Sequence, residues 1–258
     1  MVNMEIILNE RKKAKEYLET KEVDNVVQCS SILIRYFYSP ITTDAEIYTI
    51  IDGFLKQSFI GYKSENWKSL IEYQIKNLKN RKLVEIDYIP VLRKELERIQ
   101  SLENIRLEKL AFTLLIIAKY YNYINDNNNN WTNKDFKTIF KLADINVTKS
   151  KQCMLISELK EKDMIALSRK VDNLNLNVKY ICDDTEDIIF NVTNMNDLGN
   201  QYIMNVKKDN SYKQCKNCGR IIKIVKNKKY CKNCAIEVKK NTQKEWIRNK
   251  RKQALNNQ

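Results

Sequence analysis

The chain has 258 residues, with 46 Lys and Arg against 32 Asp and Glu, and it contains no histidine, four glycines and seven cysteines. The lack of histidine excludes Ser-His-Asp and Cys-His nucleophile systems, His-x-x-x-His zinc proteases and His-Glu deaminases. The four glycines are too dispersed for a P-loop or a dinucleotide-binding fingerprint, so no nucleotide cofactor is expected.

The excess positive charge is confined to the last fifth of the chain. Residues 207–258 hold 17 basic and 3 acidic residues, a net charge of +14, whereas residues 1–206 hold 29 of each kind. Four of the seven cysteines lie in the same basic segment. A basic appendage on a neutral body indicates a polyanionic partner, either nucleic acid or an anionic surface, and nucleic acid is the partner expected here.

No membrane or export signal is visible in the sequence. The longest apolar stretch, Leu110–Ala118, is far shorter than the roughly 20 residues that span a bilayer. The start, Met1–Leu8, lacks a basic region followed by an apolar region. The single cysteines Cys29, Cys153 and Cys182 are expected to be core side chains, so the sequence predicts a soluble cytoplasmic protein.

Residues 1–104 are predicted to form a helical domain, because glycine and proline are scarce and apolar residues recur at helical spacing. Thr43, followed by Asp44 and Glu46, is the expected N-cap of one of its helices. Leu83–Ile89 is predicted to be extended, with Pro90 as a break before the next helix. The predicted helices are Leu8–Lys21, Val26–Tyr38, the segment from Thr43 through Leu55, Ser64–Lys79 and Val91–Leu102.

Residues 105–185 predict a winged helix-turn-helix, in which three helices precede a β-hairpin. Thr132 with Asp135 resembles a capping box for the second helix, and Thr148 is the expected cap of the third. The period then changes from 3.6 to 2 around a turn at Asp172-Asn173. The predicted elements are helices Arg106–Ile124, Lys134–Leu142 and Thr148 to about Lys162, and strands Met164–Val171 and Leu174–Ile181.

Such a module places its last helix in the DNA major groove and its hairpin against the backbone. Lysine and serine suit phosphate contact, and glutamine suits an adenine edge. The alternative is a three-helix core with a structural hairpin that binds only protein, since residues 133–185 hold 10 basic and 8 acidic residues. The candidate contacts are Lys149, Ser150, Lys151 and Gln152 in the last helix and Arg169 and Lys170 near the hairpin tip.

A connector, residues 186–210, is predicted to contain a strand at Ile188–Val192 and a helix at Asn196–Val206. An acidic run precedes it, and carboxylates in such a run could hold magnesium for a nuclease. No paired lysine or second acidic strand accompanies the run, so a solvated turn is predicted, with no catalytic residue and no enzymatic activity. The run consists of Asp183, Asp184, Glu186 and Asp187.

Residues 211–258 contain the most specific motif of the chain, the two C-x2-C pairs Cys215/Cys218 and Cys231/Cys234. Two residues between thiolates allow both sulfurs to reach one tetrahedral ion at about 2.3 Å, and Gly219 tolerates the unusual backbone after the first pair. In a reducing compartment a zinc site is favoured over two disulfides. Four cysteines leave no open coordination position, so one structural Zn²⁺ is predicted.

The zinc module is predicted to be a zinc ribbon or treble-clef finger, with a hairpin from Ile221 to Val225 between the knuckles and a basic helix after Cys234. Basic residues with an interleaved Trp suit phosphate contact and base stacking. The alternative is a solvated tail with Trp246 and Ile247 folded back on the body. The candidate contacts in this helix are Lys239, Lys240, Lys244, Trp246, Arg248, Lys250 and Arg251.

Short stretches in this order resemble a family of phage and prophage proteins from low-GC Gram-positive bacteria: Leu83–Pro90, Arg106–Leu114, Lys170–Asn173, the Cys-x2-Cys-Gly motif at Cys215–Gly219, and Lys229–Ala235. The resemblance implies a mobile-element context in a host cytoplasm but no particular activity. The N-terminal stretches Ile32–Tyr38, Ala45–Phe54 and Trp67–Leu78 are similar in layout to the helical domain at the C-terminus of phage and plasmid primases. The catalytic primase core is absent.

The sequence therefore predicts a mainly α protein that binds nucleic acid, with duplex DNA as the expected form, in transcription regulation or replication of a phage or mobile element. The alternative is an interaction module whose partner is a host or phage protein. Such a module would inhibit or redirect a host nucleic-acid machine, such as a polymerase or a defence complex.

Overall fold

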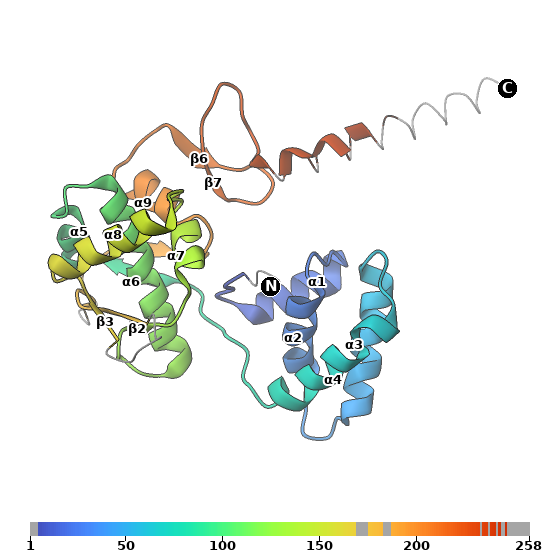
Figure 1. The fold of residues 1–258 in the computed structure, drawn as a ribbon. Coiled ribbons are helices and arrows are strands. Elements are labelled where there is room, and N and C mark those ends of the chain that lie inside the picture. Colours follow the sequence, from blue (N-terminus) through green and yellow to red (C-terminus); the bar gives the residue numbers. More distant parts are fainter. Residues whose placement is uncertain are drawn as a thin grey trace. The chain divides into compact units, whose positions relative to one another are not determined.

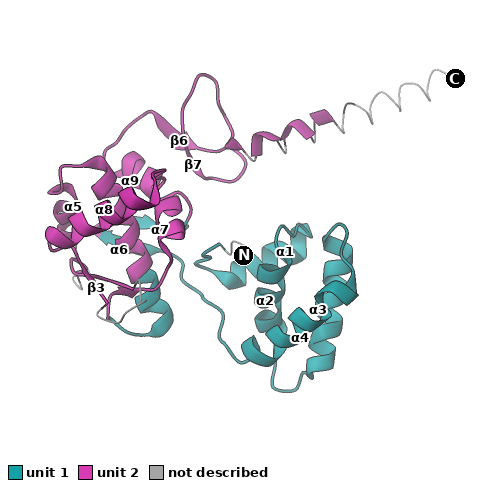
Figure 2. Ribbon diagram, in the orientation of Figure 1, with its two compact units in different colours: residues 1–91, 119–128, 191–195 teal, residues 92–118, 129–190, 196–258 magenta. Residues whose placement is uncertain are grey.

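The computed structural model describes residues 5–168, 175–182, 187–232, 234–236, 238–240, 242–243 and 246. The chain is mainly helical, with small antiparallel sheets, and it divides into two units (Figure 2). The first unit comprises residues 1–91, 119–128 and 191–195, and the second comprises 92–118, 129–190 and 196–258. Among the helices in these described residues, none combines the length and the apolar character of a membrane span.

In the first unit three helices pack around a fourth, α2, which contacts each of them (Figure 1). The four are α1 (Glu10–Thr20), α2 (Val26–Phe37), α3 (Asp44–Ser58) and α4 (Ser64–Leu78). Apolar side chains of α2 form the centre of the core, because three successive residues, Ile32, Leu33 and Ile34, are all buried. These helices match the ranges predicted from apolar spacing.

Local capping explains where α3 begins. The Thr43 Oγ1 accepts a hydrogen bond from the Glu46 backbone N–H, and the Glu46 carboxylate accepts one from the Thr43 backbone N–H at 2.8 Å. This capping box satisfies two backbone donors that a helix leaves without intrahelical partners. The structure confirms the N-cap expected at Thr43.

Replacement of Thr43 by alanine is expected to lower the unfolding free energy of the first unit by about 1 kcal/mol, because the capping hydroxyl is lost. Urea unfolding followed by far-UV circular dichroism measures the difference. Thr42→Ala is the matched control, since the Thr42 hydroxyl does not cap α3. Equal stability of the two variants would show that the capping box contributes nothing measurable.

The strand β1 (Ile89–Leu92) contains Pro90 and pairs with β5 (Ile188–Val192) in a two-stranded sheet. Proline has no N–H to donate to a ladder, but its carbonyl is still available, and Lys119 Nζ donates to the Pro90 oxygen at 2.8 Å. The helix predicted from Val91 therefore begins later, as α5 (Arg93–Gln100), because residues 89–92 are extended.

The second unit is built on residues 105–118 of α6 (Ile105–Asn125), and those from Leu107 to Ala118 are all buried. Around it lie β2 (Trp131–Thr132), α7 (Phe136–Leu142), α8 (Lys149–Glu161), β3 (Ile165–Leu167) and β4 (Leu176–Val178). The strands form an antiparallel sheet in the order β2-β4-β3, in which Thr132 pairs with Leu176 and Ile165 pairs with Val178. Residues 169–174, including Arg169, Lys170 and the predicted turn, lie outside the described residues.

The start of α7 differs from the prediction. Asp135 is the N-cap, and its side chain accepts from the Thr138 N–H at 2.9 Å. Thr132 does not cap the helix, because it is buried in β2, a strand that the sequence did not reveal. The cap of α8 is the predicted one, since the Thr148 side chain accepts from the Lys151 N–H.

The remaining elements are α9 (Leu198–Asn205), β6 (Tyr212–Gln214) and β7 (Ile221–Lys223). β6 and β7 form an antiparallel hairpin, and α9 packs against both strands. After β7 the described residues from 234 onward are helical. The connector helix and the hairpin together position the four cysteines.

Candidate metal centre and its surroundings

The first cysteine pair lies in the turn of the β6–β7 hairpin. Gln214 pairs with Ile221 at the end of the ladder, and the Cys215 N–H donates to the Arg220 oxygen at 2.7 Å. Gly219 has φ of +69°, a value that glycine adopts without a steric cost. The prediction of a hairpin between the two cysteine pairs is therefore wrong: the strand that pairs with β7 precedes the first pair.

The second pair is brought back to the first by backbone hydrogen bonds. The Cys231 N–H donates to the Cys215 sulfur at 3.2 Å and so joins the two pairs. Within the second pair, the Cys234 N–H donates to the Cys231 sulfur at 3.5 Å. The Lys216 N–H also donates to the Lys229 oxygen at 3.1 Å. This second hydrogen bond joins the first pair to the residues just before the second pair. Helical hydrogen bonding begins at Cys231, whose oxygen accepts from Ala235.

The four sulfur atoms of Cys215, Cys218, Cys231 and Cys234 all lie within 4.8 Å of one another. A tetrahedral ion with sulfur ligands at 2.3 Å requires sulfur-to-sulfur distances of about 3.8 Å. The Cys218 and Cys231 sulfurs lie 3.8 Å apart, far beyond a disulfide bond, and all four cysteines are free. The arrangement fits one structural metal ion such as zinc and leaves no ligand position for a substrate.

The lowered pKa of Cys215 favours metal binding. Burial raises the pKa of its thiol, but the backbone N–H groups of Cys218, Cys231 and Asn217 outweigh burial and lower the pKa to about 6. These N–H groups stabilise the thiolate, which is the form that binds metal. The same hydrogen bonds therefore fix the backbone around Cys215 and favour its thiolate form.

The connector helix α9 is fixed to α6 by a buried carboxylate, Glu108, that is 3% exposed. The Tyr202 hydroxyl donates to Glu108 Oε2 at 2.6 Å, and Lys207 Nζ lies 2.6 Å from the same oxygen. On the other side of α9, Asn200 Nδ2 donates to the Ile221 oxygen at 3.4 Å. Sequence reasoning missed Glu108, and the available signal was a charged residue within the apolar run of α6.

The candidate contacts in α8 differ in exposure. Lys149 and Ser150 are exposed, whereas Lys151 and Gln152 are half-buried, and Gln152 Nε2 lies 3.5 Å from the Val147 oxygen as a donor. The predicted inner stripe of Leu155, Ile156 and Leu159 is buried. The outer face also carries Cys153, whose predicted place in the core is wrong because the residue is exposed. Met154, which sequence reasoning did not name, lies beside it and is 56% exposed.

The described part of the C-terminal helix exposes its candidate contacts. Lys239 and Lys240 are exposed, and the Trp246 side chain is 57% exposed. Lys244, Arg248, Lys250 and Arg251 lie outside the described residues.

The acidic run is described only at its end. Asp187 Oδ2 forms an ion pair with Arg93 Nε at 2.7 Å, while Asp183, Asp184 and Glu186 lie outside the described residues. In the part of the chain that the structure describes, the four cysteines are the only group of three or more candidate ligands close enough to hold a metal.

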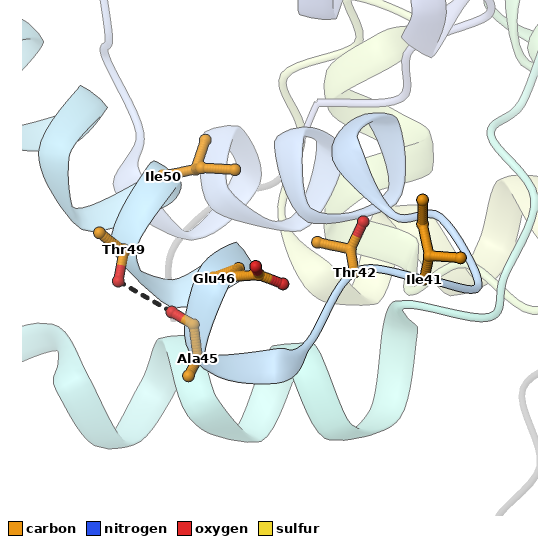
Figure 3. A pocket seen from close by; sticks show the side chains of 6 residues that line it. All are labelled: Ile41, Thr42, Ala45, Glu46, Thr49 and Ile50. Carbon is orange, nitrogen blue, oxygen red and sulfur yellow. Dashed lines mark hydrogen bonds between the residues drawn. The ribbon is translucent and has the colours of Figure 1, made fainter.

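A pocket on the first unit lies at the N-terminal end of α3 (Figure 3). Its single charged side chain is Glu46, whose carboxylate already accepts from Thr43 in the capping box. The Thr49 hydroxyl donates to the Ala45 oxygen at 2.9 Å, so this hydroxyl is also engaged. The lining residues are Ile41, Thr42, Ala45, Glu46, Thr49 and Ile50, which bring together no acid-base pair or nucleophile.

Comparison with known proteins gives no match to a protein-family model, to a curated protein or to a solved structure. The resemblances to phage proteins and to the primase helical domain stay predictions from short stretches of sequence. The conclusion on the site is therefore the one that the geometry gives, a closed four-cysteine centre that fits one structural metal.

Proposed function

We propose that this chain is a DNA-binding protein of a phage or other mobile element, acting in transcription regulation or replication. The observation that carries the proposal is the element order α6-β2-α7-α8-β3-β4 with the sheet order β2-β4-β3. We interpret this order as the plan of a winged helix-turn-helix, with α8 in the place of the recognition helix. The metal centre adds a second, strongly basic module on the same chain.

The ion in this centre is proposed to be Zn²⁺. Thiolate sulfur is a soft ligand that selects zinc over magnesium, calcium and manganese, and the four sulfurs have the spacing of a tetrahedral site. The ion would supply folding energy to a segment too small to bury a core of its own. The apolar cluster described there is small, with Ile222 and Tyr230 beside the cysteines.

The exposed end of α8 supports contact with the DNA backbone. Thr148, Lys149 and Ser150 are all exposed where the helix begins. Backbone N–H groups and hydroxyl and ammonium groups at such an end bind phosphate. The exposed Met154 further along the same helix is an apolar side chain of the kind that contacts a thymine methyl group.

Affinity of the full-length protein for a random 30-bp duplex, measured between about 50 and 200 mM salt, tests this function. Log affinity is expected to fall linearly with log salt, and Lys149→Ala is expected to reduce that slope by about 0.9, the value for one phosphate contact. Lys63→Ala, which removes an exposed lysine from the first unit, is the matched control. Absence of binding, or binding without a salt slope, would refute the proposal.

A second candidate function is a protein-interaction module that inhibits or redirects a host polymerase or defence complex. Cys153 and Met154 favour it, because the middle of the outer face of α8 is uncharged. Capture from host lysate treated with nuclease separates the two functions. A specific partner that survives nuclease supports this candidate, and loss of every partner after nuclease excludes it.

A further inference from the structure

The metal module carries a strong positive charge even without the basic residues from Lys239 onward. Residues 207–236 hold 10 basic residues and one acidic residue, a net charge of +9. A zinc ion with four thiolates contributes about −2, which leaves about +7 on some thirty residues. The one carboxylate, Asp209, accepts from the Ser211 N–H at 2.8 Å. Charge of this density favours a polyanionic partner.

Between Cys215 and Cys234 six lysines are exposed, and in the described residues no ion pair joins any of these six to a carboxylate. The hydrogen bond from Lys216 to Lys229 makes the first knuckle and the loop after β7 neighbours. In the loop, Lys226 has φ of +53°, and the Lys228 N–H closes a turn on the Val225 oxygen at 3.2 Å. The six are Lys216, Lys223, Lys226, Lys228, Lys229 and Lys232.

We propose that these six lysines form a phosphate-binding surface of the metal module, separate from α8 and from the basic residues that begin at Lys239 in the C-terminal helix. The two cysteine pairs with their metal, together with the β6–β7 hairpin, fix the backbone positions of these lysines. Their ammonium groups can then contact the phosphates of a nucleic acid. This inference rests on the proposed DNA-binding function and adds to it a second place of contact.

Two observations favour nucleic acid over an anionic membrane. The large apolar side chains that the module exposes are Val225 and Ile236. Two separate side chains offer little apolar area, whereas interfacial binding requires a continuous apolar face. The lysines also belong to the same unit as α8, which is proposed to bind the groove.

A different role is available to Lys216 and Lys232, each of which follows a cysteine ligand. Their ammonium groups would balance the negative charge of the metal and its thiolates. Lys226, Lys228 and Lys229 do not follow a cysteine ligand, because they lie in the loop that precedes the second pair. A role in balancing the charge of the metal site is therefore less available to them. The test therefore uses the loop lysines.

The experiment compares the full-length protein with Lys226→Ala/Lys228→Ala/Lys229→Ala, using the 30-bp duplex and the same salt series. The slope of log affinity against log salt is expected to fall by roughly 2 to 3 in the triple variant, since each phosphate contact contributes about 0.9. Lys63→Ala/Lys68→Ala/Lys76→Ala removes three exposed lysines of the first unit and is expected to leave the slope unchanged. Metal content is measured in all three proteins and is expected to be equal, because none of the lysines is a ligand.

Three results would overturn the inference. The first is an unchanged slope in the loop variant while the wild type binds DNA, which refutes this surface and leaves the proposed function intact. The second is an equal loss in both triple variants, which assigns the effect to net charge. The third is binding to phosphatidylcholine vesicles that contain phosphatidylserine, with no binding to DNA, which refutes the proposed function as well.

Discussion

Replacement of Cys231 by serine is expected to reduce the metal content from one zinc per chain to near zero and to unfold the metal module. Cys231 is central to the site, since its N–H donates to Cys215 and its sulfur accepts from Cys234. Zinc binding supplies about 10–16 kcal/mol to small zinc-finger peptides, and a module of this size has little other source of stability. Native mass spectrometry measures the stoichiometry, and hydrogen exchange measures the protection of the β6 and β7 amides.

The control for this variant is Cys153→Ser, which removes an exposed cysteine of α8 outside the cluster. It is expected to keep one zinc per chain and the full protection of the hairpin. A wild-type protein with no metal and a protected hairpin would contradict the assignment, because the module would then fold without an ion. Loss of zinc in both variants would show that the effect is not specific to the cluster.

Replacement of Gly199 by alanine is expected to destabilise the second unit by about 3 kcal/mol or more, at the upper end of the cost of overpacking. A Cβ at this position would lie 1.9 Å from the Ala143 backbone oxygen and 2.5 Å from Lys109 Cε. Neither neighbour is free to move, because Ala143 is the C-cap of α7 and Lys109 Nζ donates to the Asp144 oxygen at 2.9 Å. Urea unfolding followed by circular dichroism measures the loss.

Gly53 provides a control in which the expected change in unfolding free energy has the opposite sign. It lies inside α3, and a Cβ there would meet nothing within 4 Å. Gly53→Ala is therefore expected to stabilise the first unit by about 0.5 to 1 kcal/mol, the usual gain in a helix interior. If Gly199→Ala proves as stable as the wild type, α9 does not pack as closely against the Ala143 backbone as the structure shows.

Predictions from the sequence succeeded where one local rule decides the outcome. The spacing of the cysteines follows from the reach of two thiolates to one ion, and their clustering is confirmed. Thr43 and Thr148 cap the predicted helices because a side-chain oxygen needs only a nearby N–H. The same holds for the helices of the first unit, whose apolar spacing is regular over several turns.

Predictions failed where the outcome depends on a distant segment. Trp131–Thr132 is a strand because β4 pairs with it, and two residues carry no readable alternation. The hairpin at the first knuckle was misplaced because β6 has no apolar pattern of its own, with two half-buried residues and one exposed residue. The charge of Glu108 within an apolar run was a signal that the residue is paired, but it did not identify the partner, because Tyr202 lies 94 residues away.

The chain changes from neutral to strongly basic at residue 207. Lys207 nevertheless belongs to the packing of α6 and α9, because its ammonium group contacts Glu108. A fragment that ends at residue 206 would remove the basic segment but also the ammonium group that lies 2.6 Å from a buried carboxylate. Because Glu108 is buried, loss of Lys207 would leave its charge without its ion-pair partner, so such a fragment would be weakened for a reason unrelated to nucleic acid. Deletion of the basic segment therefore confounds binding with folding, and the point variants above separate the two.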